Sequence, residues 1–410
     1  MNDSTNNVKV GYRTWPIFML SFIMLFYASI FERALLNYLY FFKNVRASTL
    51  GIITSAGALS YIIAPAIGQL ITKKIGIRNA VILNSFFTTI LSGAQIFYPE
   101  PWFIILCRIG SGLSIGLFWP NLLYSISKWQ QVSSAEKSKK NLSLFNLSWN
   151  LGLIFGLMVG FFFSFFLNDY LTMIIAGILS FLLIPVSFFV EKEIKSPESQ
   201  NKILTQSESS LSPLNIEADF VINSNTPMVI YPILFSWLCM IFLTTSKSIL
   251  IFGYPLFLKI FERPSYLTYL VQAGIQLIQL IGLTWIISIN RSKIKKITLI
   301  SVLGLSIIAL TIILIGNIWY ISIIIIFAGL FIGFVQGMAI KIMLDYGASE
   351  KTTKYSVINE IVTGVGFGIT PIIAGFVAEV NLYLNYVYSM VFGLFVLIVL
   401  FYLSRNIKRH

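Results

Sequence analysis

The chain has 410 residues, of which 57% are hydrophobic and 11% are charged, and its mean hydropathy is +0.83. Soluble globular proteins do not have this composition, which is typical of proteins with many membrane-spanning helices. The formal net charge is +13, but Lys and Arg lie in short clusters between apolar runs. This pattern indicates membrane topology and argues against nucleic acid as a partner.

The residues that most enzymes and metal sites require are scarce. Cys107 and Cys239 are the two cysteines and His410 is the one histidine, which leaves no material for a disulfide framework, a metal cluster or a nucleophile with a histidine base. Nucleophile-elbow, zinc-protease and P-loop motifs are also missing from the sequence. We therefore expect no enzymatic activity, no catalytic residue, no metal and no cofactor.

Twelve apolar runs are long enough to cross the hydrocarbon core of a bilayer as helices. The first follows a polar N-terminal segment and is longer than the core of a signal peptide, so we expect it to remain as a span. The runs cover approximately residues 15–42, 49–71, 79–98, 102–127, 143–167, 170–190, 227–258, 266–289, 297–316, 318–343, 355–379 and 382–404.

Basic residues predict the orientation of these spans. If both termini are cytoplasmic, the loops on the opposite side hold only Lys43, Arg46, Lys259 and Arg263, and most other Lys and Arg are cytoplasmic. Cytoplasmic loops carry an excess of Lys and Arg. We therefore predict a multi-pass protein of a cell membrane, surrounded by the lipid bilayer, with both termini in the cytoplasm.

The chain divides into two similar halves. A polar segment at 191–225 predicts a cytoplasmic linker between an N-terminal six-helix bundle (1–190) and a C-terminal six-helix bundle (226–410). A shift of 217 residues places Ser48 on Ser265 and the pair Gly112/Gly116 on Gly329/Gly333. Two pseudo-symmetric bundles predict a carrier with its site between the halves near the middle of the membrane.

This six-plus-six arrangement with a long central loop resembles the major facilitator superfamily along nearly the whole chain. The loop Gly68–Arg78 is similar to the signature loop of the family, but Thr72 and Lys73 stand where its acid is expected. The segment Arg108-Ile-Gly-Ser-Gly112 matches an Arg-x-x-x-Gly motif associated with proton coupling. The resemblance implies an all-α fold and secondary active transport by alternating access.

A second motif is only partly present. Gly152, Gly156 and Gly160 have the spacing of the antiporter motif of this family, but Leu157 replaces its proline. The resemblance to exporters is weakened accordingly.

The first span contains two adjacent charges, Glu32 and Arg33. A charge inside a membrane span costs roughly 2.5–3.5 kcal/mol, so it usually faces the protein interior or a cavity and has a partner. Arg108 lies at a similar depth on the fourth span, which predicts an ion pair with Glu32. The pair either transfers protons during transport or statically joins the two spans.

Other polar residues outline a candidate binding site. Arg33 shares a helical face with Asn37. The shift of 217 residues places Arg33 on Leu250, and Lys247 lies nearly one turn before Leu250. Arg33, Arg108 and Lys247 against Glu32 leave an excess of two positive charges, which favours an anion or else a structural role. The candidate substrate-binding residues are Arg33, Asn37, Lys247, Tyr254, Gln272 and Gln276.

We predict a secondary transporter of a small solute, an organic or phosphorylated anion, with protons as coupling ions. Basic residues on spans one and seven resemble those of the organophosphate and organic-anion carriers of the superfamily. Two alternatives remain open: proton-coupled efflux of drug-like compounds, and a carrier-like chaperone or regulator that does not transport.

Overall fold

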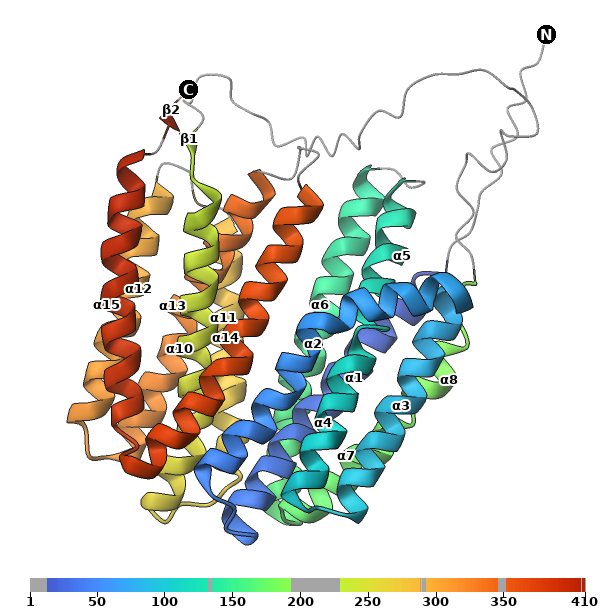
Figure 1. Ribbon diagram of the computed structural model, residues 1–410, viewed down its shortest axis with the longest axis horizontal. Coiled ribbons are helices and arrows are strands. Elements are labelled where there is room, and N and C mark those ends of the chain that lie inside the picture. The colour runs from blue at the N-terminus through green and yellow to red at the C-terminus, as the bar shows by residue number, and fades with distance from the viewer. Residues whose placement is uncertain are drawn as a thin grey trace.

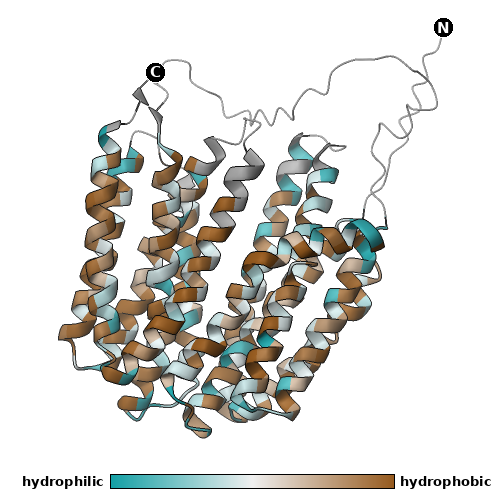
Figure 2. Cartoon of the chain, viewed as in Figure 1, coloured by the Kyte–Doolittle hydropathy of each residue, from teal (hydrophilic) through white to brown (hydrophobic). Residues whose placement is uncertain are grey.

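The computed structural model describes residues 13–131, 135–192, 229–287, 289, 293–345, 352–406 and 408–409. Twelve helical segments within this part of the chain are long and apolar enough to cross a membrane, which confirms the predicted all-α membrane fold. Figure 2 shows hydrophobic residues along most of the helices, with hydrophilic residues more frequent toward their ends. The predicted linker at 191–225 lies almost entirely outside the described residues.

The elements are numbered in chain order (Figure 1). The first half contains α1 (Trp15–Asn37), the π-helix η1 (Tyr38–Phe42), α2 (Ala47–Ile75), α3 (Ile77–Phe97), α4 (Pro101–Ile115), α5 (Trp119–Gln131), α6 (Ala135–Phe166), α7 (Asp169–Ser180) and α8 (Leu183–Ser187). The second half contains β1 (Val229–Ile230), α10 (Ile233–Ile260), α11 (Leu267–Ile287), α12 (Ile294–Leu314), α13 (Ile318–Asp345), α14 (Thr352–Val380), α15 (Leu384–Leu403), the 3₁₀ helix η3 (Ser404–Asn406) and β2 (Lys408–Arg409).

The start of the seventh span differs from its prediction. Helix α10 begins at Ile233, whereas the apolar run begins near residue 227. Pro232 is the N-cap of this helix, and a proline disfavours helical backbone in the residue before it. Val229 and Ile230 instead pair antiparallel with Arg409 and Lys408, so the predicted start was wrong by about one and a half turns.

The fourth span is interrupted, as the sequence Trp119-Pro120-Asn121 predicts. Helix α4 ends at Ile115, residues 116–118 form a turn, and α5 begins at Trp119. Pro120 has no backbone N–H, so the carbonyl of Gly116 cannot receive its usual helical hydrogen bond. The interruption lets the two parts of this span differ in direction.

Glycines bring helix backbones into contact at equivalent places in the two halves. A Cβ atom on Gly112 would lie 2.2 Å from the carbonyl oxygen of Gly57, and one on Gly329, its counterpart in the repeat, would lie 2.4 Å from that of Ile275. Helix α4 thus packs against α2, and α13 packs against α11. Since these pairs are spans four and two, and spans ten and eight, the three-dimensional packing agrees with the repeat predicted from the sequence.

Substitution of these glycines should destabilise the fold. In Gly333→Val, the new Cβ would meet the carbonyl oxygen of Gln279 at 2.3 Å, so α11 and α13 must separate. We expect at least about 2 kcal/mol of destabilisation, measured as a lower midpoint of thermal unfolding in detergent. Gly93→Val is the matched control because nothing lies within 4 Å of its Cβ. Equal midpoints for the two variants would contradict this prediction.

The two halves meet through α2 with α14 and α6 with α11. These are spans two and eleven, and five and eight, as a pseudo-twofold arrangement requires. Figure 1 shows the two groups of helices diverging toward the end that carries the termini. We call the opposite end, formed by the connections at 43–46, 167–168, 261–266 and 381–383, the closed end.

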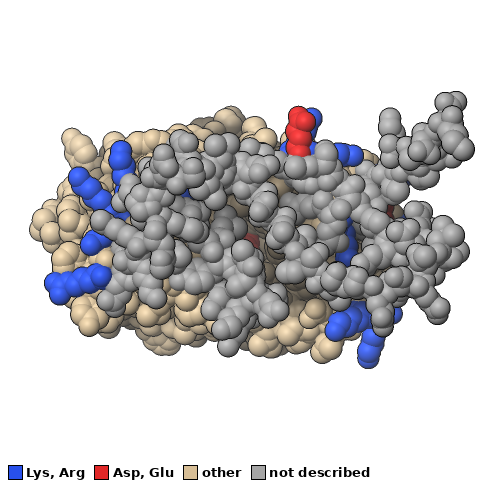
Figure 3. Space-filling model, turned by 90° about the horizontal axis from the view of Figure 1, so that it is seen from above, with Lys and Arg blue, Asp and Glu red and all other residues tan. Residues whose placement is uncertain are grey.

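The end that carries the termini is basic around its edge. Figure 3 shows Lys and Arg side chains on several sides of this face. The picture agrees with the distribution of basic residues from which the orientation was predicted.

Candidate functional site

Helix α11 carries a polar row that contacts three different parts of the protein. Thr268, Gln272, Gln276 and Gln279 follow one another along one side of this helix. Thr268 bonds Asn37 of α1, Gln272 lines a pocket beside Arg33, and Gln276 and Gln279 bond Lys247 of α10. This polar row therefore lies against charged side chains from both halves.

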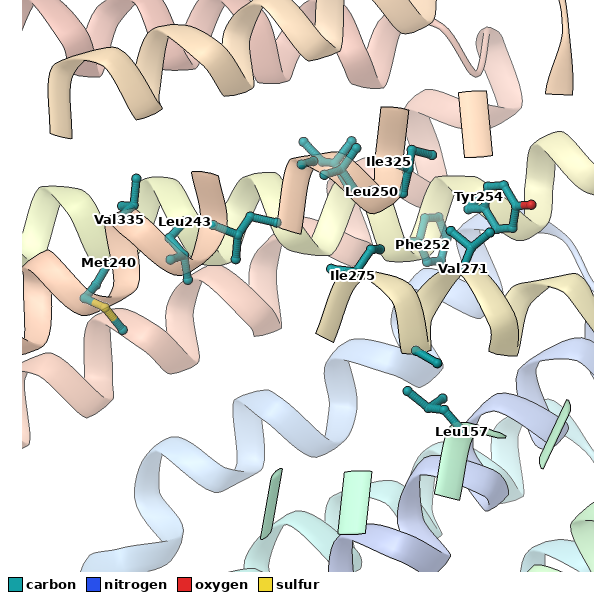
Figure 4. Packing of buried hydrophobic residues seen from close by; sticks show 14 of the residues in the cluster. Leu157, Met240, Leu243, Leu250, Phe252, Tyr254, Val271, Ile275, Ile325 and Val335 are labelled. Atoms are coloured by element: carbon teal, nitrogen blue, oxygen red, sulfur yellow. The ribbon is translucent and has the colours of Figure 1, made fainter. Parts of the chain in front are cut away.

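Arg33 reaches from the first half into a small pocket of the second half. Its side chain is 6% exposed. The pocket has a volume of about 190 Å³ and is lined by Arg33, Leu250, Ile251, Tyr254, Thr268, Val271, Gln272 and Ile275. Figure 4 shows Leu250, Tyr254, Val271 and Ile275 of these walls, with Leu157 of α6 facing α11.

Two polar atoms at this pocket have unused hydrogen-bonding capacity. Within the described part of the chain, Nε of Arg33 and Oε1 of Gln272 are buried and have no hydrogen-bond partner. Buried polar groups are nearly always bonded. A free donor and a free acceptor at one pocket therefore indicate a place for a polar ligand.

Tyr254 forms the aromatic part of the pocket wall. Its side chain is buried, and its hydroxyl is 2.7 Å from Oγ of Ser322 on α13. This contact holds the ring in place, so that its face can pack against the apolar part of a ligand.

Lys247 is held by neutral groups. Its Nζ donates to Oε1 of Gln279 at 2.8 Å and to Oε1 of Gln276 at 3.3 Å. Gln279 in turn donates to Oε1 of Gln336 on α13 at 2.5 Å. Among the described residues no carboxylate lies within ion-pair distance of Lys247. Amide oxygens do not neutralise an ammonium, so Lys247 retains a buried positive charge.

Arg33 and Lys247 are not directly opposite each other. Arg33 lies beside Gln272, and Lys247 lies beside Gln276, which is four residues further along α11. The two cations are therefore offset by about one helical turn along this helix.

The predicted ion pair between Glu32 and Arg108 is confirmed. Nη1 of Arg108 lies 2.8 Å from Oε1 of Glu32, and joins α4 to α1. The Arg108 side chain is 12% exposed, whereas that of Glu32 is 58% exposed. The carboxylate is therefore much more exposed than its partner, which is largely enclosed. The role of this pair in proton coupling remains a prediction.

Asn37 lies in a cluster at the closed end. Its Nδ2 donates to Oδ1 of Asp169 (3.3 Å), to the carbonyl of Ser265 (3.1 Å) and to Oγ1 of Thr268 (2.9 Å). Asp169 also accepts from Oγ of Ser164 (2.7 Å) and from Oγ of Ser265. We call Asn37, Ser164, Asp169, Ser265 and Thr268 the Asp169 cluster. It joins α1, α6 and α7 to α11 and to the turn that precedes α11.

Asp169 changes the predicted charge balance. Its side chain is 1% exposed, and Arg33 interacts electrostatically with both Asp169 and Glu32. Three cations thus oppose two carboxylates, and the excess is one positive charge instead of two. The sequence-based count omitted Asp169 because it lies at the expected start of a span, where an acid is usually exposed. The signal available in the sequence was a lone acid in the very short connection Leu167-Asn168-Asp169-Tyr170 between two apolar runs.

Comparison with known families decides the class of protein. The profile of the Major Facilitator Superfamily matches residues 14–345. The chain belongs to the major facilitator superfamily. Its members are secondary transporters of small molecules, so this is a multi-pass membrane transporter and not an enzyme.

Solved structures within the superfamily have the same fold. A mutant of the nucleoside transporter NupG matches with a TM-score of 0.71 and 13% identity, over 95% of this chain and 99% of NupG. A second NupG structure matches with a TM-score of 0.67 and 14% identity, over 96% and 98% of the two chains. Identity this low establishes the shared fold alone. No curated protein sequence matches the chain.

The signature loop of this superfamily member departs from the usual pattern in a definite way. Oγ1 of Thr72, near the expected position of the acid, accepts a hydrogen bond of 2.9 Å from Nδ2 of Asn121 on α5. The bond connects α2 to the second part of the fourth span. A neutral contact therefore joins these helices at the place where the usual acid of the signature loop is missing.

Proposed function

We propose that this transporter carries a small organic or phosphorylated anion between its two halves by alternating access, in a cell membrane with both termini cytoplasmic. The observation that carries the proposal is the set of unsatisfied groups at the interface. Among the described residues, Arg33 has a donor without a partner, Gln272 has an acceptor without a partner, and the side chains that bond Lys247 are amides. An anionic solute supplies what these groups lack.

In this proposal each group has a distinct role. Arg33 and Lys247 contact the anionic group, while Gln272 and Gln276 bond the neutral polar part of the solute. Tyr254 packs against its apolar surface, and Asn37 closes the pocket at Thr268. Typical ligand pockets have roughly 300–1,000 Å³. The Arg33 pocket is much smaller than this and must therefore enlarge, as movement of the halves would allow.

Ligand-induced stabilisation tests the proposal directly. A ligand that binds the folded state raises the unfolding temperature. We would screen purified protein against organic phosphates, carboxylates, nucleosides and lipophilic cations, and then measure counterflow of each stabilising compound in proteoliposomes. Stabilisation by anions with counterflow supports the proposal. A response confined to lipophilic cations would overturn it in favour of drug efflux.

A neutral polar solute is the second candidate. Gln272, Gln276, Gln279 and Gln336 offer amide donors and acceptors of the kind that bind nucleobases or sugars. The fold shared with the nucleoside transporter NupG adds weight to this choice. Counterflow of a nucleoside that is unaffected by excess organic anion would favour it over the anion.

The Glu32–Arg108 pair leads to a prediction on proton coupling. Glu32→Gln keeps a hydrogen-bond acceptor for Arg108 but cannot exchange a proton. We expect solute accumulation driven by a pH gradient to fall at least about tenfold, while solute exchange without a gradient continues. Glu136→Gln is the matched control, since Glu136 is exposed in the first turn of α6. Accumulation at the normal rate in Glu32→Gln would rule out this role.

A further inference from the structure

We propose that Asp169 is a proton-binding site that keeps the closed end shut as a carboxylate and allows it to open when protonated. The proposal requires that the halves separate at the closed end during transport. It does not depend on the class of solute.

The Asp169 carboxylate holds the two halves together. It accepts hydrogen bonds from Asn37 and Ser164 of the first half and from Ser265 of the second. Hydrogen bonds to an ionised acceptor are about twice as strong as neutral ones. Asn37 extends the contact, because it also bonds the carbonyl of Ser265 and the hydroxyl of Thr268.

Few charged groups face this carboxylate. Arg33 on α1 and Tyr269 on α11 interact with it electrostatically, and Glu32 lies beyond Arg33. Tyr170, the next residue of α7, stacks its ring on Tyr38 of α1.

The other elements around Asp169 add little charge. Before α11, the side chains of Glu262 and Arg263 are exposed, and α6 contributes the Ser164 hydroxyl. On α3, which packs against α7, the basic residue Arg78 is at the opposite end of the helix. Among the described residues, Asp169 is therefore the buried acid at the closed end.

Protonation changes the bonding in a defined way. An ionised carboxylate is only an acceptor, whereas a carboxylic acid presents an O–H donor at one of its oxygens. That donor faces groups that now donate to Asp169, so at least one of these bonds must break or reverse its direction, and the bonds that remain no longer end on an ionised acceptor. The proton also removes the negative charge that opposes Arg33. Both changes weaken the contact between the halves.

The closed end provides its own comparison carboxylate. Glu379 of α14 accepts from the backbone N–H of Ser48 at 3.1 Å and from its hydroxyl at 2.5 Å, and so also joins the halves. Glu379 is exposed, whereas Asp169 is buried. Glu379→Gln weakens a contact between the halves without removing a buried acid, whereas Asp169→Asn removes the buried acid itself. Comparison of the two variants therefore separates these effects.

Accessibility of a cysteine behind the cluster tests the proposal. Val271 is 3% exposed and lines the Arg33 pocket, and the native Cys107 and Cys239 are buried and can be replaced by Ser. In Val271→Cys, labelling by a membrane-impermeant maleimide from the closed-end side is measured between pH 5 and 8, after correction for the pH dependence of maleimide reactivity with a soluble thiol.

We expect corrected labelling to increase at least about tenfold toward low pH. With Asp169→Asn it should be high at every pH, and with Glu379→Gln it should keep its pH dependence. If labelling of Asp169→Asn still depends on pH, or if it stays low at every pH, the proposal is overturned. If Asp169→Asn does not fold, Ser265→Ala must raise labelling, and unchanged labelling there would be equally decisive. Since no solute is added, a wrong solute class cannot produce these failures.

Discussion

Lys247→Met is expected to abolish counterflow of the anionic solute. Methionine has a similar length and occupies the same buried space, but it has no charge and no donor. Loss of a buried charged contact to a ligand costs about 2–5 kcal/mol, which reduces the affinity for the ligand by a factor between about 30 and several thousand. The protein should still fold, because the amides that bond Lys247 are neutral and Gln279 keeps its bond to Gln336.

Lys128→Met is the matched control for this substitution. Lys128 lies on α5 of the first half, over the ring of Tyr124, whereas the polar row lies on α11 of the second half. We expect normal counterflow in this variant and a loss in Lys247→Met at equal amounts of monodisperse protein in the liposomes. Normal counterflow in both would show that Lys247 does not bind the solute.

Much of the fold could be predicted from the sequence because apolar length alone determines where a chain can cross a bilayer. Most predicted spans agree with the helices to within a few residues. The difference at the start of α10 arises where the apolar run from residue 227 contains Pro232. Hydropathy measures the cost of exposure to water but not whether a backbone can be helical, so it placed this boundary too early.

The Glu32–Arg108 pair was predictable for a similar reason. Charges inside a span need partners, few were available, and depth in the membrane selected between them. The Asp169 cluster was not predictable in this way. The three hydrogen-bond partners of Asn37 in this cluster lie 132, 228 and 231 residues further along the chain. They meet only after the two halves have docked.

The position of Lys247 illustrates the limit of the repeat. An offset of 217 residues places Arg33 on Leu250, and Leu250 indeed lines the Arg33 pocket. Lys247 is nearly one turn away on α10, where the amides of Gln276 and Gln279 receive it. The repeat predicts which helices meet, but side-chain partners determine where a charge is held along them.

Arg33→Met is expected to have two separable effects, loss of solute binding and loss of stability. The second arises because Asp169 would remain buried without the cation that interacts with it. Addition of Asp169→Asn removes this stranded charge, so the double variant should be more stable than Arg33→Met alone. Coupling energies in buried networks are about 0.5–3 kcal/mol, and we expect this one within that range from unfolding midpoints of all four proteins.

The double variant should recover stability but not binding, since Arg33 supplies the free donor at the pocket. This combination separates the role of Arg33 as a ligand for the solute from its role beside Asp169. Thermal shift by the solute would be present in the wild type and absent in both proteins that lack Arg33. Recovery of the solute-dependent shift in the double variant would mean that Arg33 only balances Asp169, and the anionic site would then rest on Lys247 alone.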